Sequence, residues 1–149
     1  MTYENIANKP KSASAVIISY KKKVLLNLRS NKKNIFYPNH WGCFGGAKDD
    51  HETYINAAIR ELFEETNIKI NKKEVNFFFN VYFVFPTTKK VIKRNYFIFN
   101  ILNINSFKKN FLLSEGVNYK FFTKEKFLTI KSIVPYDKLA IDLYFRYFG

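Results

Sequence analysis

The sequence has almost no cysteine and contains no long apolar run, internal repeat or low-complexity linker. One cysteine, Cys43, stands among 149 residues, which excludes an internal disulfide framework and a cysteine-rich zinc site. The most apolar run, Phe77 to Phe85, is far shorter than the roughly 20 residues that a membrane-spanning helix requires. The N-terminal residues lack the apolar core of a signal peptide. We therefore expect a cytoplasmic protein that does not associate with membranes.

Acidic residues are also scarce, because 12 Asp and Glu stand against 25 Lys and Arg, for a net charge of +13. Such a charge suits an anionic partner, either a phosphate-rich small molecule or RNA. The cations are mostly lysine, however, whereas arginine is preferred for bidentate phosphate recognition. Lys, Asn, Ile, Phe and Tyr are abundant together, as AT-rich coding produces. The composition therefore leaves RNA as an alternative partner that it does not favour.

The length fits one domain covering residues 1–149, which can bury a proper core without disulfides or a structural metal. Nothing in the sequence distinguishes a monomer from a homodimer.

Half of the acidic residues gather in one segment, Gly45 to Ile68. Within it, Thr53 to Thr66 has the apolar spacing of an amphipathic helix with one buried stripe. The six acids are Asp49, Asp50, Glu52, Glu61, Glu64 and Glu65, and the apolar stripe comprises Ile55, Ala58, Ile59, Leu62 and Phe63. The spacing predicts that the last three acids share the opposite face of the helix.

Like charges three or four residues apart destabilise a helix by about 0.2 to 0.5 kcal/mol per pair. Glu61, Glu64 and Glu65 therefore need a cationic partner, which Arg60 and the surplus lysines supply in part. Clustered carboxylate oxygens are also the ligands that Mg²⁺ and Mn²⁺ prefer. The cluster is consequently either a solvated acidic face or a metal site.

The order of residues along this segment favours the metal site. Gly46 is followed, after five residues, by Glu52 and, after seven more, by Arg60-Glu61-Leu62, one residue, Glu64-Glu65, one residue and Asn67-Ile68. This pattern closely resembles the Nudix box, except that Asn67 stands where that family has glycine. Asn is the next best residue for the left-handed conformation that ends many helices, so we expect Asn67 to be the C-terminal cap.

The resemblance implies an α/β fold, a Nudix-like α/β/α sandwich with a mixed central sheet and an acidic metal-binding helix. It also implies metal-dependent hydrolysis of a nucleoside diphosphate linked to another moiety, with Mg²⁺ or Mn²⁺ as cofactor. By the family pattern Glu61 and Glu65 would be the primary metal ligands, with Glu64 sharing metal or water and the Gly45 carbonyl joining the shell. Arg60 would orient the carboxylates, and Glu52 would brace the loop.

Four residues outside this segment are further candidates, each with a structural alternative. Glu115 precedes a predicted strand, where several Nudix hydrolases place an additional metal-binding carboxylate, but it could equally be a solvated loop acid. Arg29 is a weak candidate for holding substrate phosphates, and Tyr37 and Trp41 are weak candidates for contacting the base. A surface arginine and packing aromatics are the alternatives. The general base stays open between Glu61, Glu64 and Glu115.

The rest of the pattern predicts a β-hairpin, an exposed loop, a central antiparallel strand pair, a second loop, a short strand, a helical turn and a final helix. The ranges are Ala13 to Tyr20 with Val24 to Arg29, Ser30 to His40, Val75 to Phe85 with Val91 to Ile104, Ser106 to Gly116, Val117 to Phe122, Thr123 to Phe127 and Pro135 to Tyr147. The final helix is expected to cover the sheet with Leu139, Leu143, Tyr144 and Tyr147.

Two other functions compete with hydrolysis of a small nucleotide. One is removal of pyrophosphate from RNA 5′ ends, which the positive charge favours. The other is a catalytically silent Nudix-fold module that binds a nucleotide or RNA, against which the intact acidic triplet counts. The sequence does not identify the nucleotide, because base and sugar contacts come from loops outside the acidic segment.

Overall fold

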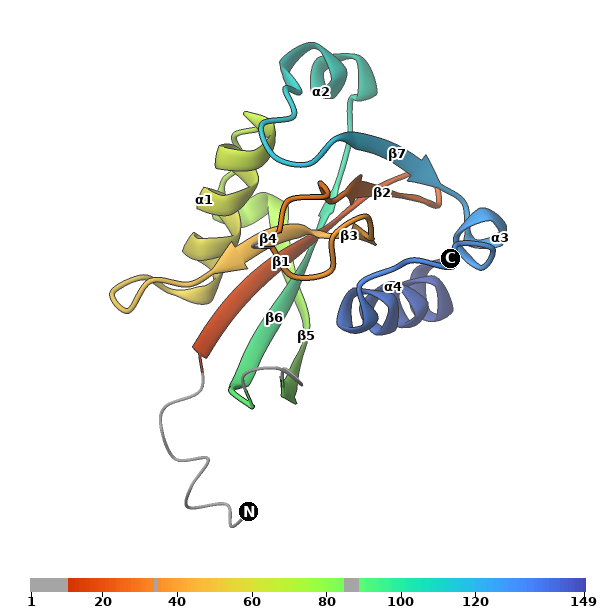
Figure 1. Ribbon diagram of the computed structural model, residues 1–149. Helices are drawn as coiled ribbons and strands as arrows, with labels where there is room; N and C mark the ends of the chain where they lie inside the picture. The colour runs from red at the N-terminus through yellow and green to blue at the C-terminus, as the bar shows by residue number, and fades with distance from the viewer. Residues whose placement is uncertain (1–10, 34, 85–88) are drawn as a thin grey trace.

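A mixed sheet of seven strands forms the centre of the structure, a computed structural model that describes residues 11–33, 35–84 and 89–149 (Figure 1). The strands are β1 (Lys11–Tyr20), β2 (Lys23–Leu28), β3 (Trp41–Gly42), β4 (Phe44–Ala47), β5 (Val75–Val84), β6 (Val91–Asn100) and β7 (Asn118–Phe122). β1 lies in the middle because it is apolar on both faces. Ala15 and Ile17 enter one core, and Val16 and Ile18 enter the other.

The strand order is β3-β2-β1-β6-β5, with β4 also paired to β1 and β7 to β2. β1 and β6 run parallel, and all other paired strands run antiparallel. The predicted hairpin of β1 and β2 is confirmed, and so is the antiparallel pairing of β5 with β6. The prediction that both strands are central is right for β6, which lies between β1 and β5, and wrong for β5, which forms an edge of the sheet. The segment from Pro86 to Lys90, which is rich in turn formers and predicts a turn between the two strands, includes residues 86–88, which lie outside the described residues.

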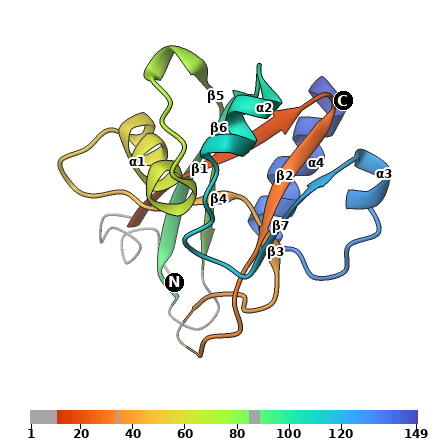
Figure 2. The same cartoon turned by 90° about the horizontal axis from the view of Figure 1, so that it is seen from above.

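Helices cover both faces of the sheet, as Figures 1 and 2 show from two directions. The helical elements are α1 (Tyr54–Thr66), the 3₁₀ turn η2 (Lys72–Glu74), α2 (Ile104–Asn110), α3 (Lys124–Phe127) and α4 (Pro135–Phe148). α1 packs Ala58 and Leu62 into one core, and α4 packs Ile141 and Tyr144 into the other. The predicted α/β class with a mixed central sheet is therefore confirmed. No helix in the described parts of the chain is long and apolar enough to cross a membrane.

The loop predicted from Ser106 to Gly116 is wrong in its first half. Residues there belong to α2, which begins where the Asn103 side chain accepts a hydrogen bond from the Ser106 backbone N–H at 3.0 Å. β6 accordingly ends at Asn100 and does not reach Ile104. An asparagine N-cap of this kind satisfies one of the free N–H groups at a helix start, which makes so short a helix tenable.

The final helix has the predicted position but buries a different face. Tyr144 is buried as expected, whereas Leu139 and Tyr147 are exposed. The buried residues are Asp137, Ala140, Ile141, Tyr144 and Phe145. Their spacing is that of an amphipathic helix, but its first buried position holds Asp137. Because the prediction used apolar residues alone, it assigned the buried side to a neighbouring face of the helix.

Candidate functional site

The acidic helix α1 begins and ends where the sequence predicted. The Thr53 side chain accepts a hydrogen bond from the Asn56 backbone N–H at 3.2 Å and caps the N-terminus. Asn67 has a φ of 62° in the left-handed region, and its N–H donates to the Phe63 carbonyl at 2.8 Å. Asn67 therefore closes the helix as a left-handed C-cap, in the conformation for which glycine and asparagine are best suited.

The buried face of α1 is rotated toward the acids relative to the prediction. Ala58 and Leu62 are fully buried, but Phe63 is 39% exposed, with the Lys69 ammonium 5.3 Å from its ring centroid. Glu65, predicted on the outer face, is only 5% exposed. The prediction that all three glutamates lie on the face opposite the buried stripe is therefore wrong for Glu65, which is buried, whereas Glu61 is half-buried and Glu64 is exposed.

Glu65 is held against strand β4, which precedes the helix. Its Oε2 accepts a hydrogen bond from the Gly45 backbone N–H at 3.0 Å. Gly45 admits no side chain, whereas at Gly46 only the flexible Glu61 side chain would have to move. A Cβ on Gly45 would lie 2.2 Å from the Ser14 carbonyl oxygen, and one on Gly46 would lie 2.7 Å from Cδ of Glu61. The glycine pair thus lets the backbone pass directly beneath two carboxylates.

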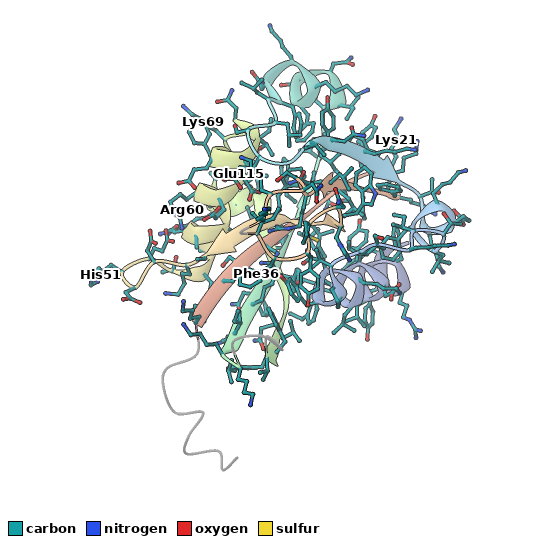
Figure 3. All side chains as sticks on the ribbon, in the orientation of Figure 1. Lys21, Phe36, His51, Arg60, Lys69 and Glu115 are labelled. Carbon is teal, nitrogen blue, oxygen red and sulfur yellow. The ribbon has the colours of Figure 1, made fainter. Side chains whose placement is uncertain are left out.

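Glu115 lies close to these carboxylates although it is distant in sequence. The Ser114 N–H donates to the Glu65 carbonyl at 2.8 Å, and the Leu112 N–H donates to the Thr66 carbonyl at 2.9 Å. These two bonds fix the loop of Glu115 to the end of α1, and Figure 3 shows Glu115 beside that helix. The structure therefore brings Glu115 to the same place as the acids of the helix.

The acids of this cluster perturb one another. Burial raises the pKa of Glu65 well above its ordinary value, and the negative charges of Glu115 and Glu61 raise it further, whereas the Gly45 N–H opposes them. Burial is also the largest cause of the raised pKa of Glu61; Arg60 counteracts it, and Glu64 and Glu115 add to it. A cluster that penalises its own negative charge in this way is an environment in which a cation is favoured.

Arg60 is the cation that the structure supplies. Its Nε donates to Oε2 of Glu52 at 3.0 Å, and its NH1 donates to Oε1 of Glu61 at 3.0 Å and to Oε2 of Glu64 at 3.2 Å. Its NH2 donates to the Ala47 carbonyl at 3.0 Å. The guanidinium lowers the pKa of Glu52 to about 2, chiefly through the hydrogen bond between them. Arg60 therefore ties the loop after the glycines to the carboxylates of the helix (Figure 3).

The other candidate residues lie nearer to α4 and β7. The Arg29 Nε donates to the Phe36 carbonyl at 2.6 Å, so this arginine holds the loop that follows β2. Tyr37 packs edge-to-face on Tyr136 of α4 with ring centroids 6.0 Å apart. Trp41 packs edge-to-face on Phe122 of β7 at 5.0 Å. Trp41 therefore makes the packing contact that was expected as the structural alternative to a role in substrate binding. Tyr37 lies beside the first turn of α4.

Sequence reasoning missed a second buried acid, Asp137. Its Oδ1 accepts hydrogen bonds from the Tyr96 hydroxyl at 2.6 Å and from NH2 of Arg94 at 3.3 Å, and its Oδ2 accepts one from the Cys43 N–H at 2.9 Å. The sequence signal that could have revealed it is an acid at a core position of the final helix. Asp137 from α4 and Glu65 from α1 therefore hold the two ends of the segment from Cys43 to Gly45.

Comparison with known proteins decides the family. The model of the NUDIX domain matches residues 8–142, which is most of the chain. The protein belongs to the Nudix family. A curated relative, the 8-oxo-dGTP diphosphatase of Buchnera aphidicola subsp. Acyrthosiphon pisum (strain APS), is 37% identical over 78 residues, covering 52% of this chain and 56% of that protein. The chain thus spans little more than half the length of this relative.

Solved Nudix structures share the fold. The MutT protein from Methanosarcina mazei Go1 superposes with a TM-score of 0.74 at 22% identity, over 94% of this chain and 96% of that one. The MutT NUDIX hydrolase from Burkholderia pseudomallei gives a TM-score of 0.74 at 15% identity, over 91% and 98% of the two chains. At these identities the comparison establishes the architecture alone.

Nudix hydrolases generally use divalent metal ions, and the donor chemistry of the cluster fits such an ion. Glu61, Glu64, Glu65 and Glu115 offer carboxylate oxygens, which hard cations prefer, and the cluster is penalised for its negative charge. Among the residues that the structure describes, however, no three His, Cys, Asp or Glu side chains are arranged as a ready metal site. Arg60 engages two of the glutamates and the Gly45 N–H engages a third. A metal ion held by these carboxylates would therefore require their side chains to rotate away from Arg60 and from the Gly45 N–H.

Proposed function

We propose that this Nudix protein hydrolyses a phosphoric anhydride linkage in a nucleoside diphosphate joined to another moiety, with Mg²⁺ or Mn²⁺ bound by the glutamate cluster. The observation that carries the proposal is the gathering of Glu61, Glu65 and Glu115, from a helix and a distant loop, beside the glycine pair of β4. Membership of the Nudix family supports it, and so does the name of the Buchnera relative, which describes a diphosphatase.

Each residue of the cluster has a separate task in this proposal. Glu61, Glu64, Glu65 and Glu115 hold the cation together with the carbonyl of Gly45. Arg60 keeps Glu61 and Glu64 oriented and balances their charge while the site is open. The bound cation would supply neutralisation of the pyrophosphate charge and activation of water. Glu61, Glu64 and Glu115 all remain candidates for the general base that accepts the proton of the attacking water.

Substrate selection is assigned to the side of the molecule where α4 begins. Tyr37 presents an aromatic ring there, and such a ring can stack on a nucleobase, whereas the ring of Tyr136 already stacks on Phe83 with centroids 4.2 Å apart. Arg29 lies close enough to affect the electrostatics of Tyr136, so its charge is available to phosphate in the same region. Trp41 is the weakest of the proposed substrate contacts because its ring packs on Phe122.

A substrate panel tests the proposal. Purified protein is incubated with 8-oxo-dGTP, the unmodified dNTPs, nucleotide sugars, ADP-ribose and dinucleoside polyphosphates, each with Mg²⁺, with Mn²⁺ and with a chelator. We expect metal-dependent cleavage of a diphosphate linkage in at least one of them, with 8-oxo-dGTP first in order of expectation because of the relative's name. If none of these compounds is hydrolysed with Mg²⁺ or with Mn²⁺, while the folded protein still binds one of them, the chain is a binding module and the proposal is wrong.

The net charge of +13 favours one second candidate, removal of pyrophosphate from triphosphorylated RNA 5′ ends. Triphosphorylated RNA therefore joins the same panel. If the charge is largely compositional, short single-stranded RNA should bind weakly and lose affinity steeply as salt rises. Tight binding at physiological salt together with faster hydrolysis of the RNA end than of free nucleotides would instead make the RNA end the substrate.

A further inference from the structure

The outer edge of β5 is unusually open to pairing. Among the described residues no strand pairs with β5 except β6, and β5 ends the strand order of the sheet (Figures 1 and 2). Its ten residues, VNFFFNVYFV, include no charged residue, proline or glycine. Edge strands of soluble proteins are usually short or carry lysine or proline, because their free N–H and C=O groups recruit other strands. This edge has none of those protections.

One face of β5 is also left bare by the helices. Phe77, Tyr82 and Val84 are 55%, 58% and 52% exposed. They stand opposite Phe97, Lys93 and Val91 of β6, and Phe97 belongs to the core on the α1 side of the sheet. α1 packs mainly on β1 and β4, so it does not extend over this outer strand. The three exposed side chains therefore form an apolar face continuous with the free edge.

A β-bulge makes the residues of β5 symmetric about Asn80. The register with β6 shifts between Phe77 and Phe79, so that Phe77 and Phe78 together occupy one position of the ladder. Asn80 pairs with Asn95 of β6, and the β6 partners of Tyr82 and Phe77 each lie two residues from Asn95, on opposite sides of it. Val84 and Val75 are related in the same way. The bulge therefore places matching apolar side chains on the same face at equal distances from the centre of the strand.

We propose that β5 pairs antiparallel with β5 of a second copy of this chain, about a two-fold axis at Asn80. In that arrangement Tyr82 meets the partner's Phe77, and the two Asn80 amides face each other across the axis. Val84 lies at the ladder position opposite the partner's Val75, whose own side chain is buried in the core. Self-complementarity is what a closed two-fold interface requires, since each contact occurs twice. The apolar side chains that meet are aromatic, and aromatic residues form favourable cross-strand pairs.

Charge is compatible with this partner and gives the dimer a distinctive salt dependence. β5 itself is uncharged, so the net charge of +13 on each copy lies elsewhere on the surface. One described cation on this face is Lys93, whose ammonium lies 5.8 Å from the Tyr82 ring centroid. Repulsion between two cationic copies is screened by salt. The dimer should therefore tighten as salt rises, whereas binding of an anionic partner should weaken.

Sedimentation velocity of the full chain over a range of concentrations tests the proposal. Wild type should form a dimer that tightens with salt. The double variant Phe77→Lys with Tyr82→Lys should raise the dissociation constant at least about tenfold, because it places like charges opposite each other. Both side chains are more than half exposed, so the variant should melt at nearly the wild-type temperature. The matched control, Leu102→Lys with Leu128→Lys, changes exposed apolar residues away from β5 and should dimerise like wild type.

Hydrogen exchange supplies the second readout, with the expectation that amides of Val75–Val84 exchange more slowly as protein concentration rises. Three results would overturn the proposal. The first is a wild-type monomer whose β5 amides are protected independently of concentration, which would show that another part of the same chain covers the edge. The second is a wild-type monomer with unprotected amides, and the third is a dimer that the Phe77 and Tyr82 variant leaves intact. The inference does not depend on the proposed activity.

Discussion

Glu65→Gln is expected to lower kcat at least ~100-fold, the scale on which loss of one preorganised electrostatic group is felt. Glu65 is buried, and its Oε2 accepts the hydrogen bond of the Gly45 N–H. A glutamine oxygen can accept the same bond, so β4 should keep its geometry while the site loses one negative charge. If that charge acts chiefly in the transition state, kcat and kcat/KM should fall together.

The same variant should be at least as stable as wild type in metal-free buffer at neutral pH. Burial raises the pKa of Glu65, so its charged form is penalised in the folded protein, and this cost is present above the ordinary pKa of glutamate. Glutamine removes that cost. Glu125→Gln, which changes an exposed acid of α3, is the control and should alter neither rate nor stability. A Glu65→Gln enzyme within about tenfold of wild-type kcat would exclude Glu65 from the machinery.

Asp137→Ala should produce the largest loss of stability among single substitutions in α4, about 3 to 5 kcal/mol of unfolding free energy. Arg94 is buried, and its NH2 lies 3.3 Å from Oδ1 of Asp137. Removing the carboxylate leaves this charge without its partner and leaves the Tyr96 hydroxyl and the Cys43 N–H without their acceptor. Urea unfolding followed by circular dichroism measures the change.

The same helix offers a matched control. Lys138 and Asp142 form an ion pair at 2.9 Å on its exposed side, and such i,i+4 pairs contribute only about 0.3 to 0.5 kcal/mol. Asp142→Ala should therefore be nearly neutral. Replacing both buried partners, Arg94→Met with Asp137→Leu, should recover most of the loss, because no uncompensated charge remains. Equal costs for Asp137→Ala and Asp142→Ala would show that the buried pair does not stabilise the fold.

Much of the acidic segment could be predicted because its signals are local. Apolar periodicity indicated the range of α1, and Asn67 was expected to end it, as it does. The positions of Glu65 and Asp137 were missed for a common reason. Each is an acid at a core position of an amphipathic helix. An interpretation that assigns every acid to the exposed face therefore predicts the wrong buried face for the helix. An acid that completes a buried stripe is itself a sign of a functional or ion-paired site.

Features that depend on distant contacts could not be predicted. Local pattern left Glu115 equally a solvated loop acid, and only the family resemblance made it a metal-ligand candidate. The hydrogen bonds from Ser114 to Glu65 and from Leu112 to Thr66 place its loop at the end of α1. β5 was expected at the centre because it is strongly apolar, but an apolar strand can also lie at an edge. Its position follows from the parallel pairing of β1 with β6, which no local pattern specifies.

Calorimetric titration with Mg²⁺ and Mn²⁺ tests most directly the claim that the glutamate cluster is a metal site. The account predicts saturable binding to wild type, which Glu61→Gln with Glu65→Gln abolishes and the exposed-site control Glu125→Gln preserves. A ligand that binds only the folded state stabilises it by about 2.7 kcal/mol at a hundredfold excess over its Kd, so the melting temperature of wild type should rise with metal. Absence of binding and of any melting shift in wild type, or undiminished binding by the double variant, would contradict the account.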